Sequence, residues 1–224
     1  MTELSRIPLF PLGLALLPDM VLPLHIFEER YKEMTAHCLA AELPFGIVLF
    51  DGRAIRSVGC LAHITRVLER YDDGRLDILT RGGMRFVVQR LIEEKAYLEA
   101  DVLFFDDAPE APPDDLQAVV ASARDLLREM AADAELGVDA ADFGAVLAPG
   151  RLSFAIAALK GFSPVERQGI LEMTSPAERL KKCVQALGSI VVRNRLTREI
   201  QHLIGGNGHP PQRILDQLEG KGPP

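Results

Sequence analysis

The sequence lacks the short motifs that mark common catalytic and cofactor sites. It contains no GxxxxGK[ST] phosphate-binding loop, no HxH or HExxH histidine spacing and no G-x-S-x-G nucleophile turn. The pair Gly82-Gly83 is too short to be a dinucleotide-binding fingerprint. We therefore expect no metal and no cofactor, and we assign no catalytic residue.

Cysteine is scarce, and its spacing excludes the usual cysteine-based sites. The three cysteines, Cys38, Cys60 and Cys183, are odd in number and form no CxxC pair. This argues against a disulfide framework or a structural zinc site and favours a reducing compartment. Cys60 and His63 lie three apart in an expected strand, so they point to opposite faces, which disfavours a nucleophile–base pair.

Positive charge is also in short supply. The 25 Lys and Arg residues stand against 32 Asp and Glu residues, for a net charge of -7. Because proteins bind nucleic acid and anionic lipid mainly through Lys and Arg, we expect no nucleic-acid partner and no membrane partner. The basic residues Arg193, Arg195 and Arg198 are explained by their position near the end of the last expected helix.

The chain has no uninterrupted apolar run long enough to span a membrane. From Ile7 to Phe27 the only formal charge is Asp19, yet four prolines interrupt this segment. A membrane span needs ~20 continuous apolar residues, and a secretory signal needs a basic start and a helical apolar core. We therefore expect a cytoplasmic protein.

The first half of the sequence is rich in expected strands. "IPLFP" and "VLPLHI" are short extended pieces, and Asp72-Asp73-Gly74 marks a hairpin turn between two longer strands. Gly82-Gly83 predicts a sharp bend or bulge between two strands. Several strands joined by tight turns favour a small barrel, because closure removes exposed strand edges.

One helix interrupts these strands. The segment "FEERYKEMTAHCLAAE" places Phe27, Tyr31, Met34 and Cys38 on a single helical face. We expect Phe27 and Tyr31 to pack in the core and not to contact a ligand.

The second half of the sequence changes to a helical period. It begins after the acidic, proline-rich linker "DDAPEAPPDD", residues 106–115, and the apolar positions of the next helix run from Leu116 to Met130. "SPVE" at 163–166 and "SPAE" at 175–178 each predict a capped helix start, and the last helix continues towards Leu203. The expected fold class is α+β, with parts at residues 1–108 (strands), 109–204 (helices) and 205–224 (a flexible tail).

The order of motifs resembles the N-terminal, substrate-binding domain of Lon proteases. "IPLFPLGLALLPDMVLPLHIFEERYKEM" is similar to the family's P-L-[FR], variable loop and P-x-x-x-x-P-L opening. "VGCLAHITRVLERYDDGRLDILTRGGMRFVV" is similar to its hairpin region, and "LEMTSPAERL" to the start of its helix. The resemblance runs in order from about residue 7 to about residue 190.

This resemblance implies a PUA-like β-barrel followed by a C-terminal α-helical bundle. It also implies a proteolysis-related role in recognising unfolded or tagged client polypeptides. The family's ATPase and Ser–Lys peptidase modules have no counterpart in this sequence, which lacks a Walker loop. We therefore expect a stand-alone, non-enzymatic Lon-like protein.

The loop between the first two strands carries more apolar residues than a loop needs. Five of its side chains are candidates for peptide binding: Leu12, Leu14, Leu16, Leu17 and Met20. One interpretation is that they pack under the barrel or onto the helical half. The other is that they line an exposed patch or groove, which marks an interaction site.

Two functions are therefore carried forward from the sequence. The first is a polypeptide-binding module that holds client segments on the barrel surface or in a cleft between barrel and bundle. The alternative is a small-molecule-binding or cysteine-dependent enzymatic domain that uses the same cleft, with Cys60 or a histidine as the reactive group. The sequence leaves the oligomeric state undetermined.

Overall fold

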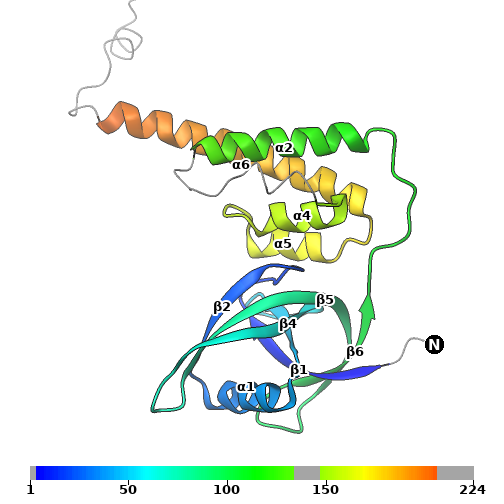
Figure 1. Cartoon of the computed structure of the whole chain (residues 1–224), viewed down its shortest axis with the longest axis vertical. Coiled ribbons are helices and arrows are strands. Elements are labelled where there is room, and N and C mark those ends of the chain that lie inside the picture. Colours follow the sequence, from blue (N-terminus) through cyan, green and yellow to red (C-terminus); the bar gives the residue numbers. More distant parts are fainter. Residues whose placement is uncertain (1–3, 134–146, 206–224) are drawn as a thin grey trace, which may run out of the picture.

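The structure, a computed structural model, describes residues 4–133 and 147–205. Within these ranges the chain forms six strands with one helix among them, followed by four more helices, so the fold class is α+β as expected. Figure 1 shows the helix α1 on one side of the strands and the helices α2, α4, α5 and α6 on the other. None of the helices in the described ranges combines the length and apolar character needed to cross a bilayer.

The strands form one mixed sheet in the order β2-β5-β4-β3-β1-β6, and β5 pairs in addition with β6. Their bounds are β1 Ser5–Leu12, β2 Val21–Ile26, β3 Phe45–Phe50, β4 Ile55–Arg70, β5 Leu76–Ile92 and β6 Glu99–Phe105. Only the β1–β3 pair is parallel among these strands. The pairings β1–β3–β4–β5–β6 return to β1, so five strands close into a ring to which β2 is attached through β5.

The first strand contains Pro8 and Pro11 and still lies inside the sheet. Residues 5–8 of β1 pair with β6, whereas residues 9–12 pair with β3. Each half of β1 is therefore paired along one side. A strand with a free side tolerates a residue that has no N–H to donate.

Two turn predictions can be compared with the structure. The hairpin at Asp72-Asp73-Gly74 is confirmed, since β4 and β5 meet there and Gly74 has a φ of 82°. The bulge at Gly82-Gly83 is also present, because Gly83 and Met84 together oppose the single residue Leu61 of β4. It lies within β5, however, so the prediction that it separates two strands was wrong.

The helices form two groups. Their bounds are α1 Glu29–Ala41, α2 Leu116–Asp133, α4 Pro149–Ala158, α5 Pro164–Leu171 and α6 Pro176–Gly205. The predicted capping box is confirmed at α5, where Ser163 Oγ accepts from the Glu166 amide at 3.2 Å and the Glu166 carboxylate accepts from the Ser163 amide at 2.7 Å. At α6, Ser175 Oγ accepts from the Glu178 amide at 3.2 Å. Residues 206–224, predicted to be a tail, lie outside the described residues.

The helix α1 begins two residues later than the apolar pattern predicted. It buries Tyr31, Met34 and Cys38 against the strands, but Phe27 precedes it and keeps 60% of its surface exposed. The predicted core packing of Phe27 was therefore wrong, because the residue is not on the helix that carries the buried face. The Phe27 ring instead stacks on the His25 ring at 5.9 Å.

A buried ionic cluster joins the strands to the helices. Arg85 of β5 and Arg179 of α6 are 3% and 0% exposed. Both guanidiniums contact Asp107 of the connector, Arg85 at 2.5 Å and Arg179 through two bonds of 2.7 Å. They also donate to backbone carbonyls around α5, at Leu171 and Met173. Three segments far apart in the sequence are thus held at one point.

The electrostatics of this cluster favour the charged form of Asp107. Burial alone would raise the pKa of the Asp107 carboxyl, but the hydrogen bonds and charges of Arg179 and Arg85 outweigh it and hold that pKa below its usual range. Burial lowers the pKa of Arg85, which the Asp107 charge partly offsets. The Arg179 guanidinium also lies over the Phe154 ring, 4.0 Å from its centre.

Replacing Asp107 with asparagine is expected to lower the free energy of unfolding at pH 7 by about 3 kcal/mol, because two buried guanidiniums then lack a counter-charge. The pKa of Asp107 lies lower in the folded protein than in the unfolded chain, where it is about 3.9. The ionised carboxylate therefore contributes its full stabilisation at pH values above the unfolded pKa. This contribution is lost as the pH falls through the folded pKa.

Urea titrations of both proteins across this range should show a stability gap that narrows as the pH is lowered. Asp114→Asn, an exposed acid of the same connector, is the matched control and should change little. Equal stabilities of Asp107→Asn and the unmodified protein at pH 7 would contradict this role.

Candidate functional site

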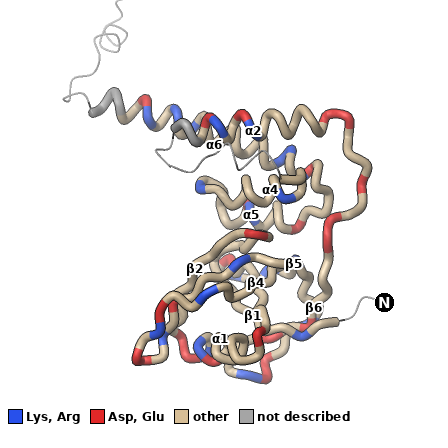
Figure 2. Tube along the Cα trace, viewed as in Figure 1, with Lys and Arg blue, Asp and Glu red and all other residues tan. Residues whose placement is uncertain are grey.

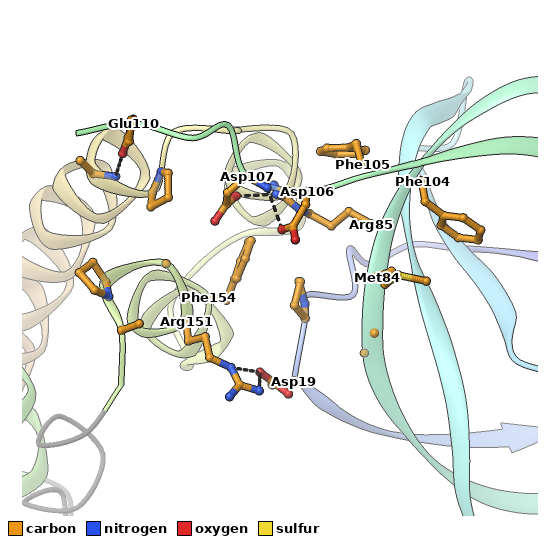
Figure 3. Close-up of a pocket in the computed structure, with 18 of the residues that line it drawn as sticks. Asp19, Met84, Arg85, Phe104, Phe105, Asp106, Asp107, Glu110, Arg151 and Phe154 are labelled. Atoms are coloured by element: carbon orange, nitrogen blue, oxygen red, sulfur yellow. Dashed lines mark hydrogen bonds and ion pairs between the residues drawn. The ribbon is translucent and has the colours of Figure 1, made fainter. Parts of the chain in front are cut away.

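A cleft of about 940 Å³ lies between the strands and the helices. Its walls come from the loop before β2, from β5 with His63 of β4, from the end of β6 with the connector and Leu116 of α2, and from the starts of α4 and α6. Figure 3 shows these segments converging around the open space. Arg85 and Asp107 of the ionic cluster are among the residues that line it.

Apolar side chains form much of the cleft wall. Met84 is 58% exposed, Phe104 and Phe105 are partly buried, and Phe154 of α4 is buried beneath the two arginines. Met84 lies at the bulge of β5 and is among the residues that line the cleft, while its neighbour Arg85 enters the ionic cluster. An exposed methionine beside phenylalanines gives an adaptable apolar surface.

A second ion pair spans the opposite side of the cleft. Arg151 of α4 contacts Asp19 of the loop before β2 through bonds of 3.0 and 2.9 Å. Figure 3 places this pair across the cleft from Asp107. Both side chains are largely exposed, so this pair is weak compared with the buried cluster.

Two further carboxylates, those of Asp106 and Glu110, line the cleft from the connector. Figure 2 shows the acidic character of this connector between β6 and α2. Asp106 accepts from the Asp107 amide at 2.7 Å, and Glu110 accepts from the Ala177 amide at 2.9 Å. Hydrogen bonds from the Ser175 side chain and the Ala177 amide hold the pKa of Glu110 below its usual range.

The five predicted loop residues lie beside the cleft and not in its wall. Leu16 and Leu17 are fully buried, whereas Leu12, Leu14 and Met20 are partly buried and pack against the main core. Pro18 and Asp19, between them in sequence, line the cleft. The loop therefore uses most of its apolar side chains to anchor itself and presents its turn to the cleft.

Gly82 of β5 holds this loop in place. The Asp19 amide donates to the Gly82 carbonyl, and the Gly82 amide donates to the Met20 carbonyl, each at 2.9 Å. The Leu17 carbonyl approaches so closely that a Cβ on Gly82 would lie 2.0 Å from its oxygen. The first residue of the glycine pair thus permits the contact with the loop, while the second leaves room for the His63 ring, because a Cβ on Gly83 would lie 2.5 Å from His63 Nε2.

The cysteines do not supply a reactive group at this cleft. Cys60 is fully buried, and this burial raises the pKa of its thiol to about 12. Burial likewise raises the pKa of Cys38 to about 11 and that of Cys183 to about 12. Among residues 4–133 and 147–205 no group of three His, Cys, Asp or Glu side chains is placed to hold a metal ion.

Reasoning from the sequence missed Met84, the two phenylalanines that end β6, and the arginine pair. One signal was available for Arg179, because it precedes Cys183 by four residues and Leu187 by eight on the apolar stripe of its helix. A charge in such a stripe indicates a buried ion pair. Met84 carried no such signal, because an isolated methionine in an expected strand does not show whether its side chain will be exposed.

The chain was compared with known families and solved structures. Residues 6–189 match the family model described as the ATP-dependent protease La (LON) substrate-binding domain. The Lon protease of Paraburkholderia phytofirmans is 27% identical over 216 residues, which cover 89% of this chain and 26% of that protein. The Lon protease of Lawsonia intracellularis is 30% identical over 190 residues, covering 79% and 22%. The chain spans about a quarter of the length of the curated relatives it matches.

Two solved structures share the fold. A Lon N-terminal domain protein from Xanthomonas campestris has a TM-score of 0.63 at 24% identity, covering 81% of this chain and 98% of that one. The N-terminal domain of Mycobacterium avium complex Lon protease has a TM-score of 0.68 at 19% identity, covering 82% and 98%.

Replacing Gly82 with alanine is expected to lower the free energy of unfolding by about 2 kcal/mol or more, because the new Cβ overlaps the Leu17 carbonyl and the loop must move. The matched control is Gly13→Ala in the same loop, where a Cβ meets nothing within 4 Å. Urea unfolding of the two variants measures the difference, and equal stabilities would show that the loop is not held at Gly82.

Iodoacetamide is expected to label Cys60 of the folded protein at neutral pH more slowly than in urea-unfolded protein, by at least about tenfold, since a buried thiol with a raised pKa supplies little thiolate. Mass spectrometry of the peptide that contains Cys60 measures both rates. Rapid labelling in the folded protein would restore the cysteine-dependent alternative.

Proposed function

This chain belongs to the family of the ATP-dependent protease La (LON) substrate-binding domain, and on that premise we propose that it is a non-catalytic module that recognises polypeptide substrates. The match spans both the strands and most of the helices, so the proposal concerns the whole described fold. The proposal does not extend to the activity of the full-length relatives, because this chain matches only about a quarter of the length of each.

The observation that carries the proposal is the apolar cleft between strands and helices. Its volume of about 940 Å³ accommodates several side chains of an extended segment. Met84 and the partly exposed Phe104 and Phe105 offer contacts that do not depend on one particular sequence. A recognition module for unfolded segments needs such tolerance, since its targets share apolar character and not a fixed motif.

The loop residues predicted from the sequence have a supporting place in this proposal. Leu12, Leu14 and Met20 are partly accessible, and Pro18 and Asp19 of the same segment line the cleft. Leu16 and Leu17 pack beneath them and fix their positions. We therefore expect the polypeptide to make its main contacts in the cleft and additional contacts with the loop.

The same proposal includes a barrel and a bundle as the two parts of the fold, a cytoplasmic location and a protein partner. The closed ring of five strand pairings supports a PUA-like β-barrel. The four helices described from Leu116 onwards support a helical bundle, with the parts divided as residues 1–108 and 109–204. Three free cysteines support a cytoplasmic location. The net charge of -7 supports a protein partner over nucleic acid or a membrane.

A small-molecule ligand in the same cleft is the second candidate. The volume of the cleft lies within the range of ligand pockets, about 300–1,000 Å³. Such a ligand would saturate the cleft without any dependence on peptide length, whereas a polypeptide would bind more tightly as its apolar segment is extended.

Replacing Met84 with aspartate is expected to weaken binding of labelled peptides from unfolded proteins by roughly tenfold, because a charge must then be desolvated on the apolar wall. Fluorescence anisotropy with a peptide panel measures the affinities. Met84 is 58% exposed, so its replacement should leave the fold intact, which circular dichroism would verify.

The matched control for this experiment is Leu68→Asp. Leu68 lies on β4 outside the cleft and is 50% exposed, so it presents a similar apolar residue in a different place. The control should bind like the unmodified protein. The proposal fails if no peptide of the panel binds, or if both variants lose affinity equally.

A further inference from the structure

We propose that the cleft selects polypeptide segments in which an apolar or aromatic residue lies next to lysine or arginine, and that Asp106 and Glu110 make this selection. The inference rests on the proposed function, because it names which segments the cleft prefers. It is drawn from the two carboxylates of the cleft wall that form no salt bridge with another described residue.

Six charged side chains line the cleft, and most of them are already paired. The acids are Asp19, Asp106, Asp107 and Glu110, and the bases are Arg85 and Arg151. Asp19 is paired with Arg151, and Asp107 with Arg85 and the buried Arg179. Within the described parts of the chain, neither Asp106 nor Glu110 forms a salt bridge, so these two carboxylates are available to a ligand.

The hydrogen bonds of these two carboxylates leave their charge in place. Asp106 and Glu110 accept from uncharged donors, the amides of Asp107 and Ala177. Such bonds orient a carboxylate and favour its ionised form, but they do not neutralise it. Both residues are exposed, in contrast to Arg85 and Arg179, whose guanidiniums are buried and already bonded to Asp107 and to backbone carbonyls.

The geometry places these acids beside the apolar wall. Figure 3 shows Asp106 and Glu110 along the same side of the cleft as Phe105, across from the Asp19–Arg151 pair. A segment whose apolar side chain packs on Phe105 would bring its neighbouring residue towards this acidic side. Lysine and arginine fit there best, since their aliphatic stems cover apolar surface while their cationic ends reach the carboxylates.

The expected discrimination is moderate, because the carboxylates are exposed to water. At low salt, a peptide with lysines flanking an apolar core should bind about threefold to tenfold more tightly than the same core flanked by glutamates, with glutamine flanks between them. Raising the salt concentration should reduce this difference through screening.

The test compares these three labelled peptides on the unmodified protein and on the double variant Asp106→Asn with Glu110→Gln. The amide oxygens of the new side chains retain the acceptors for the backbone N–H groups, which protects the fold. On this variant the three affinities should converge. The matched control is Asp72→Asn with Asp114→Asn, which removes the same charge from exposed acids outside the cleft wall and should retain the preference.

The outcomes separate this inference from the proposed function. If the glutamine-flanked peptide binds but the flanking charge has no effect, the selection is overturned and polypeptide binding stands. If both double variants lose the preference equally, the net charge of the protein is responsible and the role of Asp106 and Glu110 is overturned. If no peptide binds, polypeptide binding fails and the selection fails with it.

Discussion

The carboxylate of Asp107, held between two buried guanidiniums, is the interaction on which the arrangement of this molecule depends. It joins a strand, the connector and the longest helix at one point. Two like charges in a protein interior are tolerable only with a counter-charge and complete hydrogen bonding, and Asp107 with the carbonyls of α5 and its flanking residues supplies both. These directional bonds add to the apolar core that the strands and the helices share.

The cleft lies between the strands and the helices and is bordered by the features that hold them together. The buried cluster borders the cleft on one side, and the loop bonded to Gly82 borders it on the other. Met84, at the bulge of β5, is an apolar residue of the lining. Binding surface and structural support are thus adjacent in sequence, as Met84 and Arg85 illustrate. This proximity is compatible with the proposed recognition of varied polypeptides.

The sequence predicted local features well and long-range ones poorly. The hairpin turn, the capping box of α5 and the loop of apolar residues depend on neighbours a few residues apart, so the sequence pattern predicted them. The start of α1 was misjudged because Phe27 fits the helical spacing without belonging to the helix. In the buried cluster, Asp107 lies 22 positions from Arg85 and 72 positions from Arg179 in the sequence. No local sequence pattern predicts contacts between residues so far apart.

The division of β1 between two neighbours has a consequence for how the chain acquires its fold. The first half of β1 pairs with β6, the last strand to leave the ribosome, while its second half pairs with β3. The ring therefore stays open until nearly half of the chain has been synthesised, and its closure brings together the most distant strand pair in the sequence. Because Asp107 follows β6 by two residues, the pairing of β6 with β5 also brings this carboxylate close to Arg85.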